Sequence, residues 1–358
     1  MDTRHRSIGF ELRNETCLAY FDAVCPHVSR ALISDVAFDA IRSVASKLPA
    51  RYALSAFGFE CRLTGEPFAD IGLQLESSLG CGELLAMAPP LQEHLAWQVM
   101  RRFGDSWQQL GSWAQQAIDI AWLEFDVFGA RPFVPSAFWR IKKGHQRTAL
   151  EGLHAVCSGA AFSRRQLDVT CKLLTELGAT WELTKVGSML SREQPIIRLC
   201  LRAPTSDLHR AAVARVPGAV SAVERFLEFF DGVHLTLDIL DTEGVRIGLE
   251  GALPRTGPDV ASRWEQAMGY LVDYSLATSE KAAAVLDYPG HTSIYEQKDL
   301  WPASIRACWQ DQPMAATSFL IRELSHVKLT IDANGHQEAK IYLTASHYWK
   351  DFLGMRDA

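Results

Sequence analysis

The chain has 358 residues and a formal net charge of −6, with 48% hydrophobic and 22% charged residues. These proportions are typical of a globular protein and argue against a general nucleic-acid binder. No stretch approaches the roughly 18 apolar residues of a membrane span, and residues 1–6 are too polar to open a secretory signal. Eight cysteines without a Cys-x-x-Cys pair favour reduced thiols. We therefore expect a cytoplasmic protein with neither nucleic-acid nor membrane partners.

The first 50 residues predict a helical lead, because apolar residues recur at helical spacing in 18–24 and 29–48. From Phe57 the period changes to two. Apolar and polar residues alternate through 57–64 and 70–76, on either side of the turn Thr64-Gly65-Glu66-Pro67. This pattern predicts a β-hairpin with one apolar and one polar face.

The same order, a hairpin and then helices, recurs along the chain. Helices are predicted over 82–118, 147–157, 163–177, 206–215, 219–230, 257–272 and 278–286. Further hairpins are predicted from 121–127 with 136–141, 180–189 with 196–202, 233–239 with 245–249, and 326–332 with 338–344. The last hairpin turns at Asn334-Gly335, a preferred two-residue turn, whereas the faces of 180–189 cannot be assigned.

Five hairpins with an apolar face need that face covered, and the intervening helices can cover it. An open sheet would leave the polar faces in solvent, whereas a closed barrel would turn them into the lining of a lumen. About ten strands enclose a lumen too wide for side chains alone to fill. The parallel helix-wrapped barrel is excluded because its strands alternate singly with helices.

The polar faces mix charged residues with Gly, Ser and Thr, which leave space for a ligand. The charged set is Arg62, Arg140, Arg198, Arg202, Arg246, Lys328 and Lys340, with Glu60, Asp70, Glu76, Glu124, Asp126, Asp238 and Glu250. A solvated sheet face is the alternative explanation. We predict an α+β fold, a ten-stranded antiparallel β-barrel of five ββαα-type repeats with its helices outside, in a single domain over residues 1–358.

Five hairpins separated by helix pairs resemble the PT-barrel (ABBA) prenyltransferases, including the peptide-modifying members associated with cyanobactin-type ribosomal peptides. The local match is short: Phe59-Glu60-Cys61-Arg62-Leu63 in the first strand and Ala339-Lys340-Ile341-Tyr342-Leu343 in the last. The resemblance implies a transferase of natural-product biosynthesis. Its donor would be a prenyl diphosphate, and its acceptor an aromatic small molecule or a peptide side chain.

In that family, Lys, Arg and Tyr side chains from the strands hold the diphosphate, and an acid on the first strand assists proton removal. The resemblance therefore implies Glu60 as the catalytic acid/base. The implied substrate-binding residues are Arg62, Trp122, Glu124, Arg140, Arg198, His234, Arg246, Lys328, Lys340 and Tyr342. Several cations suit a leaving group whose negative charge grows as the C–O bond breaks.

Aromatic residues on the polar faces are few, namely Trp122, Phe138 and Tyr342, although an allyl cation favours aromatic surroundings. The many acids favour a cationic acceptor or an Mg²⁺-bound diphosphate, so Mg²⁺ is the one cofactor expected. No metal site of the protein's own is predicted: His234 and His326 begin strands and could pair across a lumen, but a lone histidine is more often structural. The His-Glu-x-x-His, P-loop and G-x-G-x-x-G motifs are also absent. The alternative function is a noncatalytic barrel that binds a peptide or a charged metabolite within a biosynthetic complex.

Overall fold

The strands form one antiparallel sheet in a computed structural model that describes residues 15–77, 82, 94–157, 161–193, 196–215, 220–240, 247–311, 316–332 and 336–351. The strand order is β11-β1-β2-β3-β4-β5-β6-β7-β8-β10-β9. The strands are β1 (Ala56–Arg62), β2 (Ala69–Glu76), β3 (Ile118–Phe125), β4 (Ser136–Ile141), β5 (Glu182–Ser188), β6 (Ile197–Arg202), β7 (Asp231–Ile239), β8 (Ile247–Ala252), β9 (Gly290–Ser293), β10 (Ala316–Ile331) and β11 (Gln337–Asp351).

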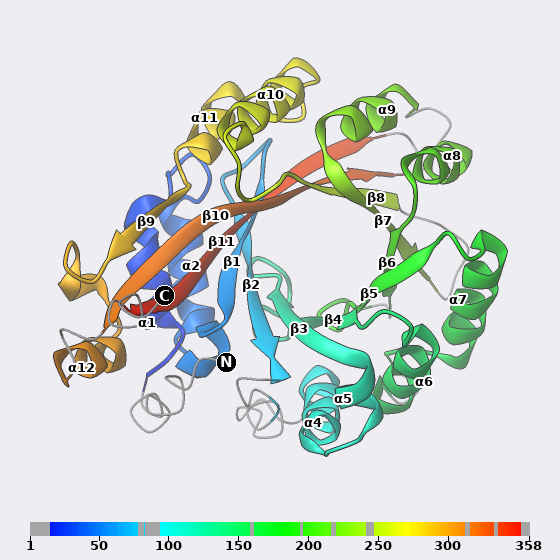
Figure 1. Cartoon of the computed structure of the whole chain (residues 1–358), viewed down its shortest axis with the longest axis horizontal. Helices are drawn as coiled ribbons and strands as arrows, with labels where there is room; N and C mark the ends of the chain where they lie inside the picture. The colour runs from blue at the N-terminus through cyan, green and yellow to red at the C-terminus, as the bar shows by residue number, and fades with distance from the viewer. Residues whose placement is uncertain are drawn as a thin grey trace, which may run out of the picture.

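The sheet closes on itself because β11 pairs with β10 as well as with β1. Ten strands, all except β9, therefore form a ring, which Figure 1 shows with the helices around it. The first strand of the ring meets the last one, with Phe57 opposite Ala345 and Glu60 opposite Tyr342. The predicted ten-stranded antiparallel barrel is confirmed, and the open sheet is wrong.

Helices connect one hairpin to the next on the outside of the ring (Figure 1). The pairs are α4 (Leu95–Gln108) with α5 (Trp113–Ala117), α6 (Gln146–Cys157) with α7 (Arg164–Leu177), α8 (Thr205–Arg215) with α9 (Val220–Phe229), and α10 (Val260–Asp273) with α11 (Ser279–Leu286). The lead before β1 contains α1 (Leu18–Val24), α2 (Asp35–Ala45) and the 3-10 turns Cys25–His27 and Ala50–Ala53. This is the predicted ββαα order with a helical lead.

The apolar core lies between the strands and the helices. On β1, Phe57 and Phe59 point outward, and their rings meet Phe21 of α1 at centroid distances of 4.9 and 5.4 Å. Aromatic rings bury large apolar areas, so such contacts hold the helices on the ring. Because successive strand residues point to opposite faces, the alternate residue Glu60 points into the barrel.

Two parts of the C-terminal region differ from the sequence-based prediction. The short strand β9, with α12 (Ala303–Asp311) and the 3-10 turn Lys298–Leu300, occupies a stretch predicted as loop. The residues of β9, Gly-His-Thr-Ser, do not alternate between apolar and polar, so the sequence pattern does not predict a strand there. Strand β10 begins at Ala316, ten residues before the predicted start, and has a bulge between Leu324 and His326. A bulge shifts the alternation by one residue, which hides the continuity of the strand.

A buried lysine joins the first hairpin to a distant helix. Lys281 of α11 is 4% exposed, and its Nζ donates to the carbonyl oxygens of Arg62 and Gly65 at 2.9 Å and of Thr64 and Glu66 at 3.3 Å. These four bonds satisfy carbonyls of the β1–β2 turn and offset the cost of burying the ammonium group.

Two further observations concern the described residues only. None of their helices combines the length and apolar character needed to cross a membrane. Six cysteines with described side chains are free thiols, and all of them are buried except Cys171.

Candidate functional site

Charged residues on the inward faces of the ring are largely buried. Arg198, Glu250 and Lys328 are 8%, 7% and 5% exposed. Strand register places Arg198 opposite Asp238, and Lys328 opposite Glu250. A charge buried to this degree requires a partner, and the pairs divide the lumen into distinct clusters.

The first cluster joins β1, β10 and β11 and is called the Glu60 cluster: Glu60, Lys340, Tyr342 and His326. Lys340 Nζ and Tyr342 OH each donate to one Glu60 oxygen at 2.5 Å. The His326 ring stacks on Tyr342, with centroids 4.0 Å apart.

The charges of this cluster fix its protonation. Burial opposes ionisation of Glu60, but the Lys340 and Lys328 ammonium groups, with the bonds from Lys340 and Tyr342, lower its pKa to about 2. Burial, helped by the nearby Lys185 and Lys328, lowers the pKa of His326 to about 3. At neutral pH, Glu60 is therefore a carboxylate with both oxygens occupied, and His326 is a neutral ring.

The second cluster gathers two cations around one acid. Lys328 Nζ lies 3.0 Å from one Glu250 oxygen and Lys185 Nζ lies 3.5 Å from the other. Because β6 and β7 lie between β5 and β8, the Lys185 side chain spans two intervening strands to reach Glu250. Its ammonium group also lies 5.4 Å from the centre of the Trp122 ring, within range of a cation–π contact. Two ammonium groups share a single carboxylate here, which leaves a local surplus of positive charge.

A third pair is a two-bond contact within the barrel wall. Arg198 Nε and Nη2 donate to the two Asp238 oxygens at 2.7 and 2.9 Å. Burial opposes the charge of the guanidinium, but the bonds to Asp238 raise the pKa of Arg198. Parallel bonds of this kind are strong and directional.

The wall formed by β2, β3 and β4 differs from these clusters. Glu124 lies between Gly72 and Ser136 in the strand register. Among the residues that the structure describes, none donates a hydrogen bond to its carboxyl group or pairs with it. Burial and the Glu60 carboxylate raise the pKa of Glu124 to about 8, against the opposing influence of Lys328 and Arg198.

The residues predicted from the sequence are thus placed as follows. The interior holds Glu60, Trp122, Glu124, Arg198, His234, Lys328, Lys340 and Tyr342. Arg62 and Arg140 lie nearer the ends of their strands, with side chains 41% and 44% exposed and carboxylates of Glu338 and Asp119 beside them. Arg246 lies outside the described residues. Their functional roles stay predictions.

Sequence reasoning missed Lys185. A bulge between Leu183 and Lys185 breaks the alternation of β5, which is why the faces of 180–189 could not be assigned. The sequence offered one indication of an inward Lys185, which was the type of residue and not its spacing. Lys185 is a lysine in a strand whose partner β6 carries an inward arginine.

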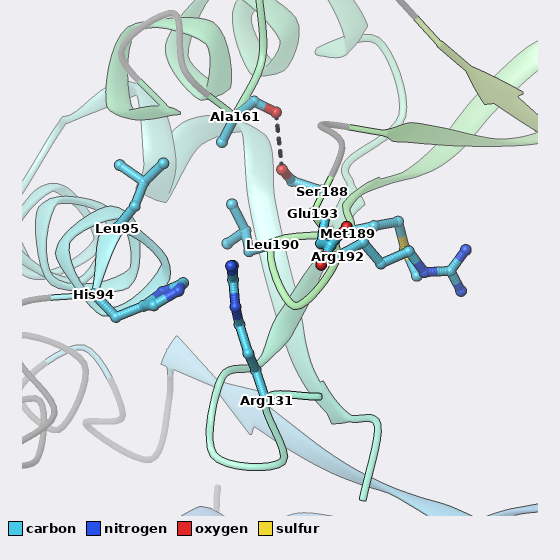
Figure 2. Close-up of a pocket in the computed structure, with 9 residues that line it drawn as sticks. All are labelled: His94, Leu95, Arg131, Ala161, Ser188, Met189, Leu190, Arg192 and Glu193. Carbon is cyan, nitrogen blue, oxygen red and sulfur yellow. Dashed lines mark hydrogen bonds between the residues drawn. The ribbon is translucent and has the colours of Figure 1, made fainter. Parts of the chain in front are cut away.

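A pocket of about 160 Å³ lies beside the barrel rim (Figure 2). Its lining comes from the start of α4 and from the β3–β4, β5–β6 and α6–α7 connections: His94, Leu95, Arg131, Ala161, Ser188, Met189, Leu190, Arg192 and Glu193. Ser191 of the same β5–β6 loop donates to Asp126 at 2.7 Å and contacts Ser136 Oγ at 2.8 Å. The loop is therefore anchored to the rim, and Arg192 of the pocket lies close enough to Asp238 of the lumen pair to help lower its pKa.

No metal site of the protein's own is found where the structure describes the chain: no three His, Cys, Asp or Glu side chains gather closely enough to hold an ion.

No protein-family model matches the sequence, and no curated protein matches it. Solved structures with a similar course of the chain include 5-dimethylallyl tryptophan synthase from Streptomyces coelicolor in complex with DMASPP and Trp (12% identity, 93% of this chain and 96% of that one, TM-score 0.46). AnaPT from Neosartorya fischeri is also 12% identical, over 82% of this chain and 77% of that one, with a TM-score of 0.44. PriB in a binary complex with product diphosphate is 12% identical, over 92% and 94%, with a TM-score of 0.47. Likenesses this distant carry no inference about chemistry, which rests on the lumen itself.

Proposed function

We propose that this protein is a prenyltransferase that moves an isoprenyl group from a prenyl diphosphate to an aromatic or peptide side-chain acceptor inside the barrel lumen. The observation that carries the proposal is the meeting of Lys185 of β5 and Lys328 of β10, strands separated by β6, β7 and β8, on the single carboxylate of Glu250. A diphosphate placed there would find two ammonium donors and an uncompensated positive charge.

The surroundings suit the rest of the donor. Trp122 lies beside the Lys185 ammonium group, and the stacked rings of His326 and Tyr342 belong to the adjoining Glu60 cluster. Aromatic faces stabilise the allyl cation that forms as the C–O bond breaks. The lysines stabilise the charge that develops on the departing diphosphate. The acceptor then attacks the allyl carbon and loses a proton to a lumen carboxylate, for which the sequence resemblance implies Glu60.

One observation favours the second candidate function, a noncatalytic barrel that binds a peptide or a charged metabolite. Lys340 with Glu60, and Arg198 with Asp238, already neutralise each other. Buried ion pairs of this kind can be purely structural.

The test is calorimetric titration with dimethylallyl and geranyl thiolodiphosphates, with and without Mg²⁺. We expect one-to-one binding that weakens at least about tenfold, roughly 1.4 kcal/mol, in Lys185→Met. The matched control is Lys172→Met, whose ammonium group lies on exposed α7 near Glu176 and should not affect binding.

Three outcomes separate the candidates. Binding of neither analogue by the unmodified protein would rule out the prenyltransferase. Equal binding by Lys185→Met and the unmodified protein would show that the diphosphate does not bind at Lys185. Tight binding without diphosphate release from the true donor, across aromatic and peptide acceptors, would favour the noncatalytic barrel. Mg²⁺ is expected to strengthen binding by accompanying the diphosphate.

A further inference from the structure

Seven acids lie on the described inward faces of the barrel, and six of them already accept a hydrogen bond, among them Glu76, which accepts from Ser55 and Gln74. Glu60, Asp238 and Glu250 bind the cations described above. Asp70 accepts the Val127 N–H at 3.0 Å, and Asp126 accepts from Ser191. Only Glu124 has no such donor among the described residues. A carboxyl group that is free in this way can take a proton or a hydrogen bond from a ligand without first breaking an internal contact.

Open space lies next to this carboxyl group. A Cβ atom placed on Gly72, which is opposite Glu124 in the register, would have no heavy atom within 4 Å. On the other side, the Ser136 hydroxyl is engaged with Ser191. The β2–β3 wall therefore combines a free carboxyl group with room for a ligand beside it.

The ionisable groups that act on Glu124 come from six other strands. They are the charged Glu60 on β1, Lys185 on β5, Arg198 on β6, Glu250 on β8 and Lys328 on β10, and the neutral phenol of Tyr342 on β11. Burial, with the Glu60 and Glu250 carboxylates, raises the pKa of Glu124 to about 8 against the opposing Lys328 and Arg198, whereas the pKa of Glu60 is lowered to about 2. A carboxylate whose pKa lies near the working pH is a far better proton acceptor than one that ionises near pH 2.

We propose that the space over Gly72 is the acceptor subsite, that the acceptor presents an N–H or O–H group there, and that Glu124 receives its proton. This inference rests on the proposed function and assigns proton removal to β3 instead of to Glu60. A bond forms between the allyl carbon and the acceptor atom, while the C–O bond breaks and its electron pair leaves with the diphosphate. The N–H or O–H proton passes to the Glu124 carboxylate, which becomes a carboxylic acid and later returns the proton to water.

The subsite is tested by titrating indole, a small N–H-bearing probe, into protein saturated with dimethylallyl thiolodiphosphate. We expect indole binding to fall at least tenfold in Gly72→Leu, with thiolodiphosphate binding unchanged. Gly269→Leu is the matched control, since Gly269 is exposed on α10 and also has open space at its Cβ position. Absence of indole binding to the unmodified protein, or equal binding in Gly72→Leu, would overturn the subsite.

The role of Glu124 is tested by the pH profile of diphosphate release from dimethylallyl diphosphate with indole. We expect kcat/KM to rise through about pH 8 as Glu124 ionises. In Glu124→Gln this rise should vanish and the rate should fall about a hundredfold or more, while Glu60→Gln keeps the rise but moves it to lower pH, because the Glu60 carboxylate raises the pKa of Glu124. A profile unchanged in Glu124→Gln would refute the assignment. Thiolodiphosphate binding in every variant reports separately on the proposed function: if it is absent throughout, the prenyltransferase itself fails.

Discussion

Two walls of the same lumen are built on opposite plans. On the wall of β10, β11 and β1, each Glu60 oxygen has a donor at 2.5 Å and a histidine ring stacks on the tyrosine. On the wall of β2 and β3, a glycine and an unpaired carboxyl group lie next to each other. On the first wall the hydrogen bonds of the carboxylate are already formed without a ligand. On the second wall the carboxyl group can still form hydrogen bonds to one. Rigid pairs on one side can hold a donor, while unmet hydrogen-bonding capacity on the other can select an acceptor.

The largest expected effect distinguishes two glycines that face each other in the register, Gly58 on the first wall and Gly72 on the second. A Cβ atom on Gly58 would lie 2.0 Å from the backbone oxygen of Leu343, so β11 would have to move. We expect Gly58→Ala to lower the free energy of unfolding by about 3 kcal/mol. Gly72→Ala, with open space at its Cβ position, should change it by less than about 0.5 kcal/mol. Urea unfolding of both variants measures the difference, and equal values would contradict the contrast between the walls.

A smaller loss is expected when the paired wall loses one cation. Lys328→Met removes the nearer ammonium partner of buried Glu250 and leaves only Lys185 at 3.5 Å. We expect the free energy of unfolding to fall by about 2 kcal/mol, because the charge of a buried carboxylate is left partly uncompensated. The exposed pair of Arg147 and Glu151 offers the control: Arg147→Met should cost less than about 0.5 kcal/mol. If both variants unfold at the same urea concentration, the lumen pair contributes nothing to stability.

The smallest effect is a pH dependence with opposite signs for the two walls. The folded pKa of Glu124 is raised to about 8, so between about pH 4.5 and 8 the folded state holds a proton that the unfolded state has released. Its contribution to stability is therefore lost as pH rises, by roughly 1 kcal/mol after allowance for screening by lumen water. The pKa of Glu60 is lowered to about 2, so its contribution is present above about pH 4.5 and is lost as pH falls. Unfolding at pH 5, 6.5 and 8 should show a decline that Glu124→Gln reduces, because Asp70, whose pKa burial raises to about 7, still contributes; Glu60→Gln should move the decline to lower pH, since the Glu60 carboxylate raises both pKa values.

Much of the barrel could be predicted because strand alternation is a local signal. Residues 57–63 and 233–239 alternate cleanly, and the structure places their apolar members outward and their polar members inward. Where a bulge interrupts the alternation, the local signal fails. It left the faces of 180–189 undefined and hid Lys185, and it shortened the prediction of β10.

The partners within the lumen could not be predicted, because they depend on which strands become neighbours. Glu60 and Lys340 are 280 residues apart in sequence, and only the pairing of β1 with β11 brings them together. Nothing in either strand alone shows that Glu60 has both oxygens occupied while Glu124 has none. That distinction, on which the choice of proton acceptor depends, appears only in the closed ring.

The joining of the first strand to the last also has a consequence for how the protein is made. During synthesis, β1 emerges long before β11, so one edge of the early sheet has no hydrogen-bonding partner until β11 has been made. The carbonyl groups of the turn after β1 likewise gain their hydrogen bonds only when Lys281 has been made, 219 residues beyond Arg62. Contacts this distant in sequence form slowly, and an unpaired strand edge invites pairing with other chains. The yield of folded protein in a cell therefore depends on protecting that edge until the final strand arrives.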